Sequence, residues 1–152
     1  MASPAGDPNP GAVLFCCTHN SIRSPMAHAI MRHLYGRTIF SDSVGVRPEP
    51  VNPFVVAVMD EIGIDMGGHR SKAFEDLEDS SFDVVVSLSP EAQHKAVEMT
   101  RVMACEVEYW PTFDPSLAQG SRETMMDAYR SVRDALMKRI KARFGQGPPP
   151  TT

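Results

Sequence analysis

The sequence has little of what several protein classes require. It contains only three cysteines, Cys16, Cys17 and Cys105, which are too few for a disulfide framework. The two adjacent cysteines have Cα atoms about 3.8 Å apart, closer than a disulfide usually spans. No Cys-x-x-Cys pair or Cys/His cluster has the spacing of a zinc site. We therefore expect no metal site and no cofactor.

Positive charge and long apolar runs are also scarce. The formal net charge is −4 and the basic residues are scattered, so a surface for nucleic acid or anionic membrane is not indicated. No apolar run approaches the roughly 18 residues that a membrane-spanning helix needs. The first eleven residues lack the basic start and apolar stretch of a signal peptide. We expect a cytoplasmic protein that binds neither nucleic acid nor membrane, and the sequence leaves its oligomeric state open.

The 152 residues fit one domain of ordinary size. Residues 1–11 and 145–152 are rich in proline, glycine and small residues, which predicts disordered ends. Between them, over residues 12–144, strand-like and helix-like segments alternate, and this pattern indicates a parallel sheet with helices on both faces. The expected fold class is α/β, a three-layer α/β/α domain with a four-stranded parallel sheet.

Hydrophobic runs and capping residues predict the individual elements. Continuous apolar or β-branched runs predict four strands, at residues 12–17, 38–44, 82–88 and 104–110. A polar N-cap followed by proline predicts three helix starts, at Ser24-Pro25, Asn52-Pro53 and Ser89-Pro90. Ser121 is expected to cap a long last helix. The expected buried stripe of that helix consists of Met125, Tyr129, Val132, Leu136 and Ile140.

The loop after the first strand carries the clearest chemistry. In an open parallel sheet, active sites lie beyond the carboxyl ends of the strands, and there Arg23 follows Cys17 by six positions, where a helix begins. Loop N–H groups and the positive helix end can hold a phosphate. Arg23 would add a bidentate clamp. The same field would keep Cys17 a thiolate, and hence a nucleophile that needs no histidine base.

Plainer interpretations compete at single positions. Cys16 is expected to be a small buried residue, because neighbouring strand residues face opposite ways. His19 is interpreted as a loop residue with an unusual backbone conformation rather than a catalytic base. Asp114-Pro115 can be a simple turn, or Asp114 can protonate a leaving group from the loop after the fourth strand.

A long stretch around this loop resembles a known family. VLFCCTHNSIRSPMA, at residues 13–27, resembles the phosphate loop of the low-molecular-weight protein tyrosine phosphatases. That family shares its fold with thioredoxin-linked arsenate reductases and bacterial protein arginine phosphatases. The matching loop residues are Cys17, Asn20, Arg23, Ser24 and Pro25. The resemblance continues through DSVGV at 42–46, residues 63–88 and FDP at 113–115, and so covers about residues 12–144.

The resemblance implies a fold of the low-molecular-weight phosphatase type and a role for each matching residue. Cys17 would attack phosphorus, Arg23 would bind the phosphoryl oxygens, and Asp114 would protonate the leaving oxygen. The phosphate loop would consist of Thr18, His19, Asn20, Ser21, Ile22 and Arg23. The residues implied to support it by hydrogen bonds are Asn20, Ser24, Ser43 and His69. The implied activity is hydrolysis of a phosphorylated protein or small phosphomonoester through a phosphocysteine intermediate.

The sequence departs from the family pattern at several positions. His19 stands where glycine is usual, and Ile22 stands where many members carry a second cysteine. Ser116 and Leu117 follow the Asp-Pro pair, where aromatic residues that stack on phosphotyrosine are common. Ser21, a small hydroxyl residue, is more like the arsenate reductases and arginine phosphatases than the tyrosine phosphatases.

These departures leave alternative functions open. Arsenate reduction requires a relay of further cysteines after the third strand, and residues 87–101 contain none. A low-molecular-weight protein tyrosine phosphatase is therefore the main prediction. Arsenate reductase and protein arginine phosphatase are the alternative enzymes, and a phosphate-binding regulatory module on the same scaffold is the non-enzymatic alternative.

Overall fold

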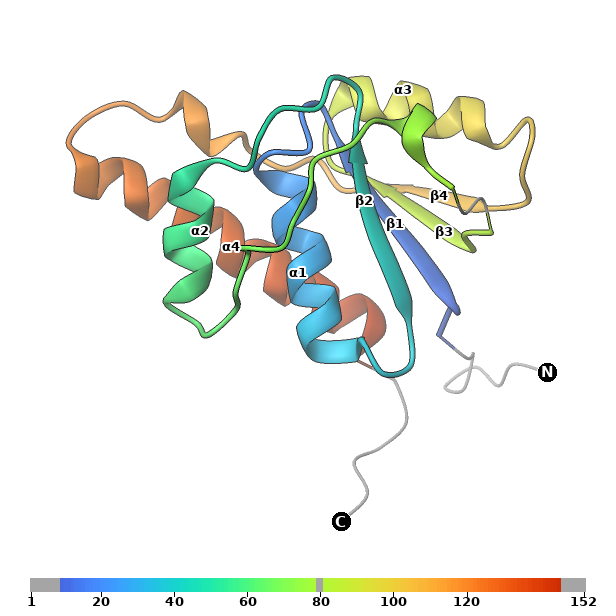
Figure 1. Ribbon diagram of the computed structural model, residues 1–152, viewed down its shortest axis with the longest axis horizontal. Helices are drawn as coiled ribbons and strands as arrows, with labels where there is room; N and C mark the ends of the chain where they lie inside the picture. The colour runs from blue at the N-terminus through green and yellow to red at the C-terminus, as the bar shows by residue number, and fades with distance from the viewer. Residues whose placement is uncertain (1–8, 79–80, 146–152) are drawn as a thin grey trace, which may run out of the picture.

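Four short strands form one parallel sheet. The computed structural model describes residues 9–78 and 81–145, so the predicted disorder of residues 1–8 and 146–152 lies outside the described residues. The strands are β1 (Ala12–Cys17), β2 (Phe40–Gly45), β3 (Val84–Ser87) and β4 (Glu106–Tyr109). They run in the order β2-β1-β3-β4 and every pair is parallel, as Figure 1 shows.

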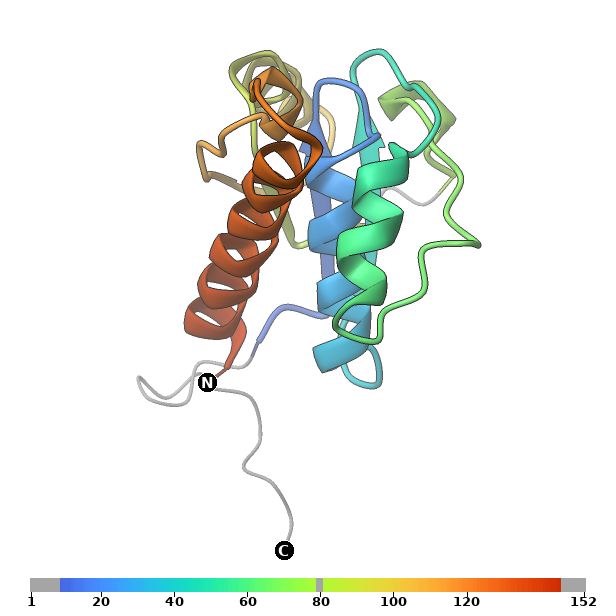
Figure 2. The same ribbon diagram turned by 90° about the vertical axis from the view of Figure 1, so that its left-hand side faces the viewer.

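Helices cover both faces of the sheet. They are α1 (Arg23–Tyr35), α2 (Pro53–Asp60), α3 (Pro90–Met99) and α4 (Arg122–Phe144), with short 3₁₀ turns η1 (Phe74–Asp76) and η2 (Pro115–Leu117). The helices α1, α2 and α4 pack together on one face, while α3 packs on β1, β3 and β4 (Figures 1 and 2). The predicted three-layer α/β/α fold is confirmed.

The two faces of the sheet bury separate apolar clusters. The larger cluster, beneath α1, α2 and α4, includes Phe15 and Cys17. The smaller one, beneath α3, includes Leu14 and Cys16. Successive strand residues point to opposite faces, so the pleat of β1 sends the two adjacent cysteines into different layers. The prediction that Cys16 is a buried core residue is confirmed, because its side chain is fully buried.

Three of the four predicted N-caps are confirmed. The side chains of Asn52, Ser89 and Ser121 accept hydrogen bonds from backbone N–H groups in the first turns of α2, α3 and α4. The prediction for Ser24 is wrong. The helix α1 begins two residues earlier, with Ile22 at the N-cap and no side-chain cap. The Ser24 hydroxyl lies 2.9 Å from the Cys17 sulfur instead, so it is engaged in the loop rather than at the helix end.

Element boundaries differ from the predictions by about two residues, as is usual at element ends. The third strand covers Val84–Ser87 rather than residues 82–88, and Phe82 and Leu88, which lie beyond the paired segment, are still buried in the core. In α4 the buried stripe holds Met126 rather than Met125, and it extends to Phe144. Within residues 9–78 and 81–145, no helix combines the length and apolar character needed to cross a bilayer.

All four strands end at the same edge of the sheet, which is the upper edge in Figure 1. The loop from β1 to α1 crosses this edge between two other connections. Residues 46–52, after β2, lie on one side of it, because their N–H groups bond to loop carbonyls. Residues 110–114, after β4, lie on the other side, where Thr112 accepts a hydrogen bond from Arg23. The sheet topology thus brings three distant segments to one place.

Candidate active site

The loop between β1 and α1 turns its carbonyl groups toward the segment 46–52. Four backbone N–H groups of the segment donate to four carbonyl groups of the loop at 2.8–3.2 Å. The donor and acceptor pairs are Val46 and Cys17, Arg47 and Thr18, Glu49 and His19, and Asn52 and Ser21. The remaining carbonyl in this stretch, that of Asn20, accepts from the Ser71 hydroxyl at 2.8 Å. Since these carbonyls are engaged outside the loop, they do not compete with its N–H groups for the space inside it.

The N–H groups of the loop are left for a ligand. Within residues 9–78 and 81–145, no acceptor is found for the N–H groups of Thr18, His19, Ser21, Ile22 and Arg23. Four of these five residues line a pocket of about 170 Å³. Successive N–H groups that converge at a helix N-terminus form an anion-binding nest. The loop can therefore hold a phosphate-like anion, which agrees with the predicted phosphate loop.

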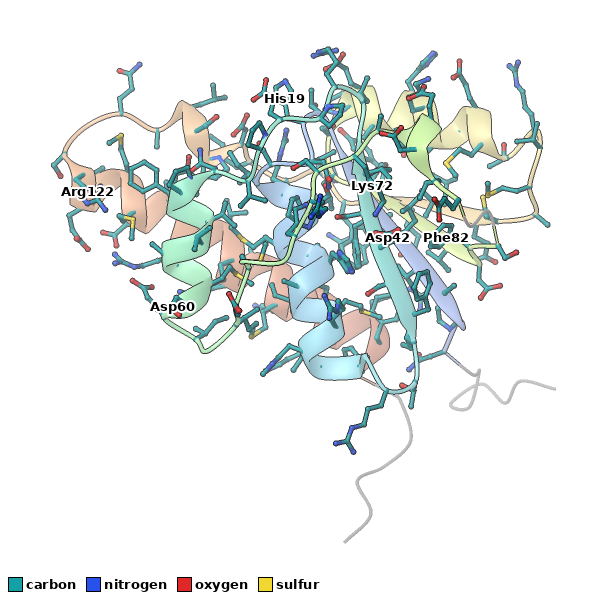
Figure 3. The ribbon with its side chains drawn as sticks, in the orientation of Figure 1. His19, Asp42, Asp60, Lys72, Phe82 and Arg122 are labelled. Atoms are coloured by element: carbon teal, nitrogen blue, oxygen red, sulfur yellow. The ribbon has the colours of Figure 1, made fainter. Side chains whose placement is uncertain are left out.

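Asn20, not His19, has the unusual backbone conformation. Its φ of +51° is the one positive φ at a non-glycine residue in the described part of the chain, so the prediction for His19 is wrong. Asparagine tolerates this left-handed region better than most residues. The turn at Asn20 brings its N–H to 3.3 Å from the Cys17 sulfur. His19 instead lies at the rim of the loop, with Nε2 3.6 Å from Glu49 (Figure 3).

The sulfur of Cys17 lies at the centre of this loop. The N–H groups of Asn20 and Ser24 point at it from 3.3 and 3.4 Å, and the Ser24 hydroxyl lies at 2.9 Å. Hydrogen bonds donated to sulfur stabilise its charged form. These donors surround the sulfur of the residue that the sequence predicted to be the nucleophile.

Arg23 and Asp114 meet at the same pocket. Arg23 donates from Nη1 to the Thr112 carbonyl at 3.0 Å, and its Nη2 lies 4.0 Å from Oδ2 of Asp114. The other carboxylate oxygen, Oδ1, accepts from the N–H and the hydroxyl of Ser116 at 3.0 and 2.7 Å. Asp114 thus caps the turn η2 with one oxygen and presents the other toward Arg23. The two sequence interpretations, turn and acid, do not exclude one another.

The side chain of Asn20 organises the support behind the loop. Its Nδ2 donates to the hydroxyls of Ser24 at 2.8 Å and Ser43 at 3.0 Å, while its Oδ1 accepts from the Lys72 N–H at 3.0 Å. His69 interacts with the Asn20 backbone, and burial is the main cause that lowers the pKa of His69. The four residues predicted to support the loop are therefore brought together.

Several residues at or near the site carry no clear sequence signal. Glu49, Asn52 and Ser116 also line the pocket. The sequence identified Asn52 only as a helix cap and Ser116 only as a departure from the family pattern, and it gave no signal for Glu49. Behind the loop, Nδ1 of His28 lies 3.5 Å from the Ser43 hydroxyl. His28 occupies a helical position with no motif around it, so only the tertiary structure identifies it.

No second thiol accompanies Cys17. The Cys16 sulfur points toward the Val86 carbonyl at 3.6 Å, in the cluster beneath α3. Cys105 packs against that same cluster, and burial raises the pKa of its thiol. Both other cysteines therefore lie on the opposite face of the sheet. Among the described residues no group of three or more His, Cys, Asp or Glu side chains is arranged to hold a metal ion.

Comparison with known proteins agrees with this geometry. Residues 12–145 match the family model described as low molecular weight phosphotyrosine protein phosphatase. The arsenate reductase of Bacillus subtilis is 33% identical over 129 residues, which cover 85% of this chain and 91% of the relative. The glutaredoxin arsenate reductase of Synechocystis is 30% identical, with 85% and 92% of the two chains covered.

Solved structures give the same picture. An arsenate reductase in the oxidized state matches with a TM-score of 0.73 and 28% identity, covering 90% of this chain and 98% of the other. A mutant of YwlE arginine phosphatase with a phosphorylated active-site serine matches with a TM-score of 0.71, covering 89% and 94% of the two chains. At 21% identity, this second similarity shows the fold alone.

Gly45 is expected to tolerate no side chain. It pairs with Cys17 at the end of β2, and a Cβ there would lie 2.6 Å from the Asn20 nitrogen and 2.7 Å from the His19 carbonyl carbon. The Gly45→Ala variant should lose about 1–3 kcal/mol of stability and bind phosphate at least about tenfold more weakly, which calorimetry can measure. Gly68→Ala is the matched control, because a Cβ at Gly68 meets nothing within 4 Å. Equal phosphate affinity in the two variants would contradict this expectation.

The free energy of unfolding is expected to decrease as the pH is lowered through a window that the pKa of His28 sets. Burial is the largest cause that lowers the pKa of His28 to about 4, whereas in the unfolded chain it is about 6.5. Between these values the unfolded chain binds a proton that the folded chain does not. The free energy of unfolding should therefore decrease as pH falls, by at most about 1.4 kcal/mol per pH unit. Urea unfolding should show that His28→Leu lacks this part of the pH dependence. If the free energies of unfolding of the wild-type and His28→Leu proteins changed in parallel with pH, this expectation would be wrong.

Proposed function

The chain belongs to the low molecular weight phosphotyrosine protein phosphatase family, and from this premise we propose that it hydrolyses phosphomonoesters through a phosphocysteine intermediate. The observation that carries the proposal is the single pocket shared by Cys17, Arg23 and Asp114. The substrate would be a phosphorylated protein side chain or a small phosphomonoester. The proposed reaction needs no cofactor, since the nucleophile, the anion clamp and the acid are all side chains of this chain.

The first step would form a bond between the Cys17 sulfur and phosphorus. The free N–H groups of the loop and the Arg23 guanidinium would hold the three non-bridging oxygens. Their charge changes as the phosphoryl group transfers, and donors fixed in advance stabilise it without reorganisation. The bond from phosphorus to the leaving oxygen breaks, and Asp114 gives that oxygen its proton.

The second step would release phosphate. Asp114, now ionised, takes a proton from a water molecule that attacks phosphorus, and the bond from phosphorus to sulfur breaks. The Cys17 thiolate is then restored, stabilised again by the N–H groups of Asn20 and Ser24. One carboxyl thus serves as acid and then as base, which balances the proton over the cycle.

A second candidate reaction is the reduction of arsenate, which the names of the two curated relatives favour. Cys17 would attack arsenic and displace water. A thiol would then attack the sulfur of that adduct, and the electron pair of the broken bond would stay on arsenic and give arsenite. Because Cys16 and Cys105 lie on the other face of the sheet, this thiol would come from outside the chain. A second external thiol would release the mixed disulfide and restore Cys17.

Replacing the nucleophile tests the covalent step. Cys17→Ser should abolish turnover of p-nitrophenyl phosphate while phosphate binding survives within about tenfold, because the loop N–H groups and Arg23 remain. Cys105→Ser is the matched control and should keep wild-type turnover. Appreciable turnover by Cys17→Ser would rule out the phosphocysteine. Phosphate binding without turnover in the wild-type protein would point to the regulatory module instead.

Parallel assays separate the candidate substrates. Phosphotyrosine, phosphoarginine and phosphoserine peptides are compared with arsenate in the presence of glutaredoxin or a small thiol. The proposal expects phosphate release from the phosphotyrosine or phosphoserine peptide at a rate above that of Cys17→Ser. Release from the phosphoarginine peptide alone, whose phosphorus is bonded to nitrogen, would favour the protein arginine phosphatase alternative. Arsenite formation without any peptide hydrolysis would favour the second candidate.

Replacing Asp114 tests the acid. In Asp114→Asn, the amide oxygen can still accept from Ser116 and cap η2, so the turn should persist while the proton is lost. Turnover of phenyl phosphate or phosphotyrosine should fall by about 10²–10⁴-fold, and p-nitrophenyl phosphate should be affected less, since its leaving group needs less protonation. Rapid-mixing experiments should show a burst of p-nitrophenol followed by slow turnover. An equal loss for all leaving groups, with no burst, would assign Asp114 to the turn alone.

A further inference from the structure

The hydrogen bonds behind Cys17 have a fixed direction. The Oδ1 atom of Asn20 accepts from the Lys72 N–H, and a backbone N–H can only donate. This bond fixes which end of the Asn20 amide is oxygen. The two hydrogens of Nδ2 are then directed to Ser24 and Ser43, at 2.8 and 3.0 Å.

Each of these serines must therefore send its own hydrogen elsewhere. Ser24 Oγ has the Cys17 sulfur at 2.9 Å and the Val44 carbonyl at 3.3 Å, and a charged sulfur is the stronger acceptor. Ser43 is fully buried, and Nδ1 of His28 lies 3.5 Å from its Oγ. This distance is longer than the other hydrogen-bond distances between these side chains, yet Nδ1 of His28 is placed to receive the Ser43 hydrogen.

We propose that His28 is a positioning residue for Cys17. Its neutral imidazole, with the hydrogen on Nε2, accepts the Ser43 hydrogen at Nδ1 and so holds Ser43 Oγ as an acceptor for the Asn20 amide, which also donates to Ser24 beside the sulfur. The inference rests on the proposed function only in taking Cys17 as the nucleophile. If Nδ1 carried a hydrogen, it would donate to Ser43. Ser43 Oγ would then accept from two donors, His28 and Asn20, and the buried Ser43 hydrogen would have no acceptor among these contacts, so the link between Ser43 and His28 would be weakened.

The surroundings of His28 keep it neutral. Burial is the largest cause that lowers the pKa of His28. The charged or titratable groups around the ring are Asp42 of β2, Arg32 of α1, and His69 and Lys72 of the segment just before η1. Asp42 alone favours the charged imidazole, but Lys72 binds Asp42 at 2.6 Å and so offsets it (Figure 3). The ring centroids of His28 and His69 lie 6.3 Å apart, with an interplanar angle of 70°. If one of these rings were protonated, its positive charge would oppose protonation of the other.

Two substitutions at His28 test the acceptor itself. His28→Leu fills the space but accepts no hydrogen bond, whereas His28→Asn can present an amide oxygen to Ser43. The readout is the rate at which iodoacetate alkylates Cys17, followed by peptide mass spectrometry between about pH 5 and 8. In His28→Leu the midpoint of the pH profile should rise by about half a unit and the rate at low pH should fall about threefold, consistent with loss of one neutral hydrogen bond. His28→Asn should restore most of the wild-type profile.

Controls separate this role from general packing. His33→Leu, at an exposed position of the same helix, should leave the profile unchanged. Ser43→Ala should raise the midpoint as His28→Leu does, and adding His28→Leu to it should have no further effect, because the link between them is already gone. If His28→Leu does not fold, Ser43→Ala and His28→Asn still test the same link.

Three results would overturn the proposal. These are an unchanged profile in folded His28→Leu, a persisting His28 effect in the Ser43→Ala background, or equal damage from leucine and asparagine at position 28. Alkylation requires no substrate, so it is measured whether or not the protein turns over any phosphomonoester. Failure of the proposed function is seen in the turnover assays, and failure of this inference is seen in the alkylation profile.

Discussion

The site depends on one constraint, the outward orientation of the carbonyl groups in the loop after β1. Four of these carbonyls accept from residues 46–52, so the peptide planes are fixed with their N–H groups facing the other way. A loop of this length without such partners would have carbonyl oxygens free to turn into the pocket, where they would repel an anion. The segment after β2 is therefore as much a part of the anion site as the loop itself, although its backbone N–H groups bond to the loop and not to the anion.

This constraint explains features that otherwise look unrelated. Asn20 adopts a left-handed conformation because the loop must reverse its direction while its N–H reaches the sulfur. Gly45 lacks a side chain because the loop backbone passes directly over the end of β2. The amide of Asn20 then ties the loop to β2 through Ser43 and to the connection before η1 through the Lys72 N–H. Local strain at one residue is thus held by contacts from three parts of the chain.

The sequence predicted what depends on near neighbours. Asn52, Ser89 and Ser121 could be identified as caps because each bonds to a residue two or three positions ahead. The position of Cys17 at a strand end could also be predicted, since the apolar run stops there. The hydroxyl of Ser24 could not be placed, because its partners are the sulfur seven residues earlier and a carbonyl twenty residues away. Glu49 and His28 carry no local pattern, and only the packing of β2 and α1 brings them to the loop.

Strand register decides which of the two adjacent cysteines is available for chemistry. β1 pairs with β2 so that Cys16 stands opposite Val44 and Cys17 opposite Gly45. A slip of one residue would reverse the faces of both cysteines, placing Cys16 toward α1 and burying Cys17 beneath α3. The alternation of apolar residues along β1 opposes this slip, because Leu14 and Phe15 fill clusters of different size on the two faces. The core of the protein therefore decides which cysteine faces the loop, and the position of the proposed nucleophile Cys17 follows from packing that begins several residues before it.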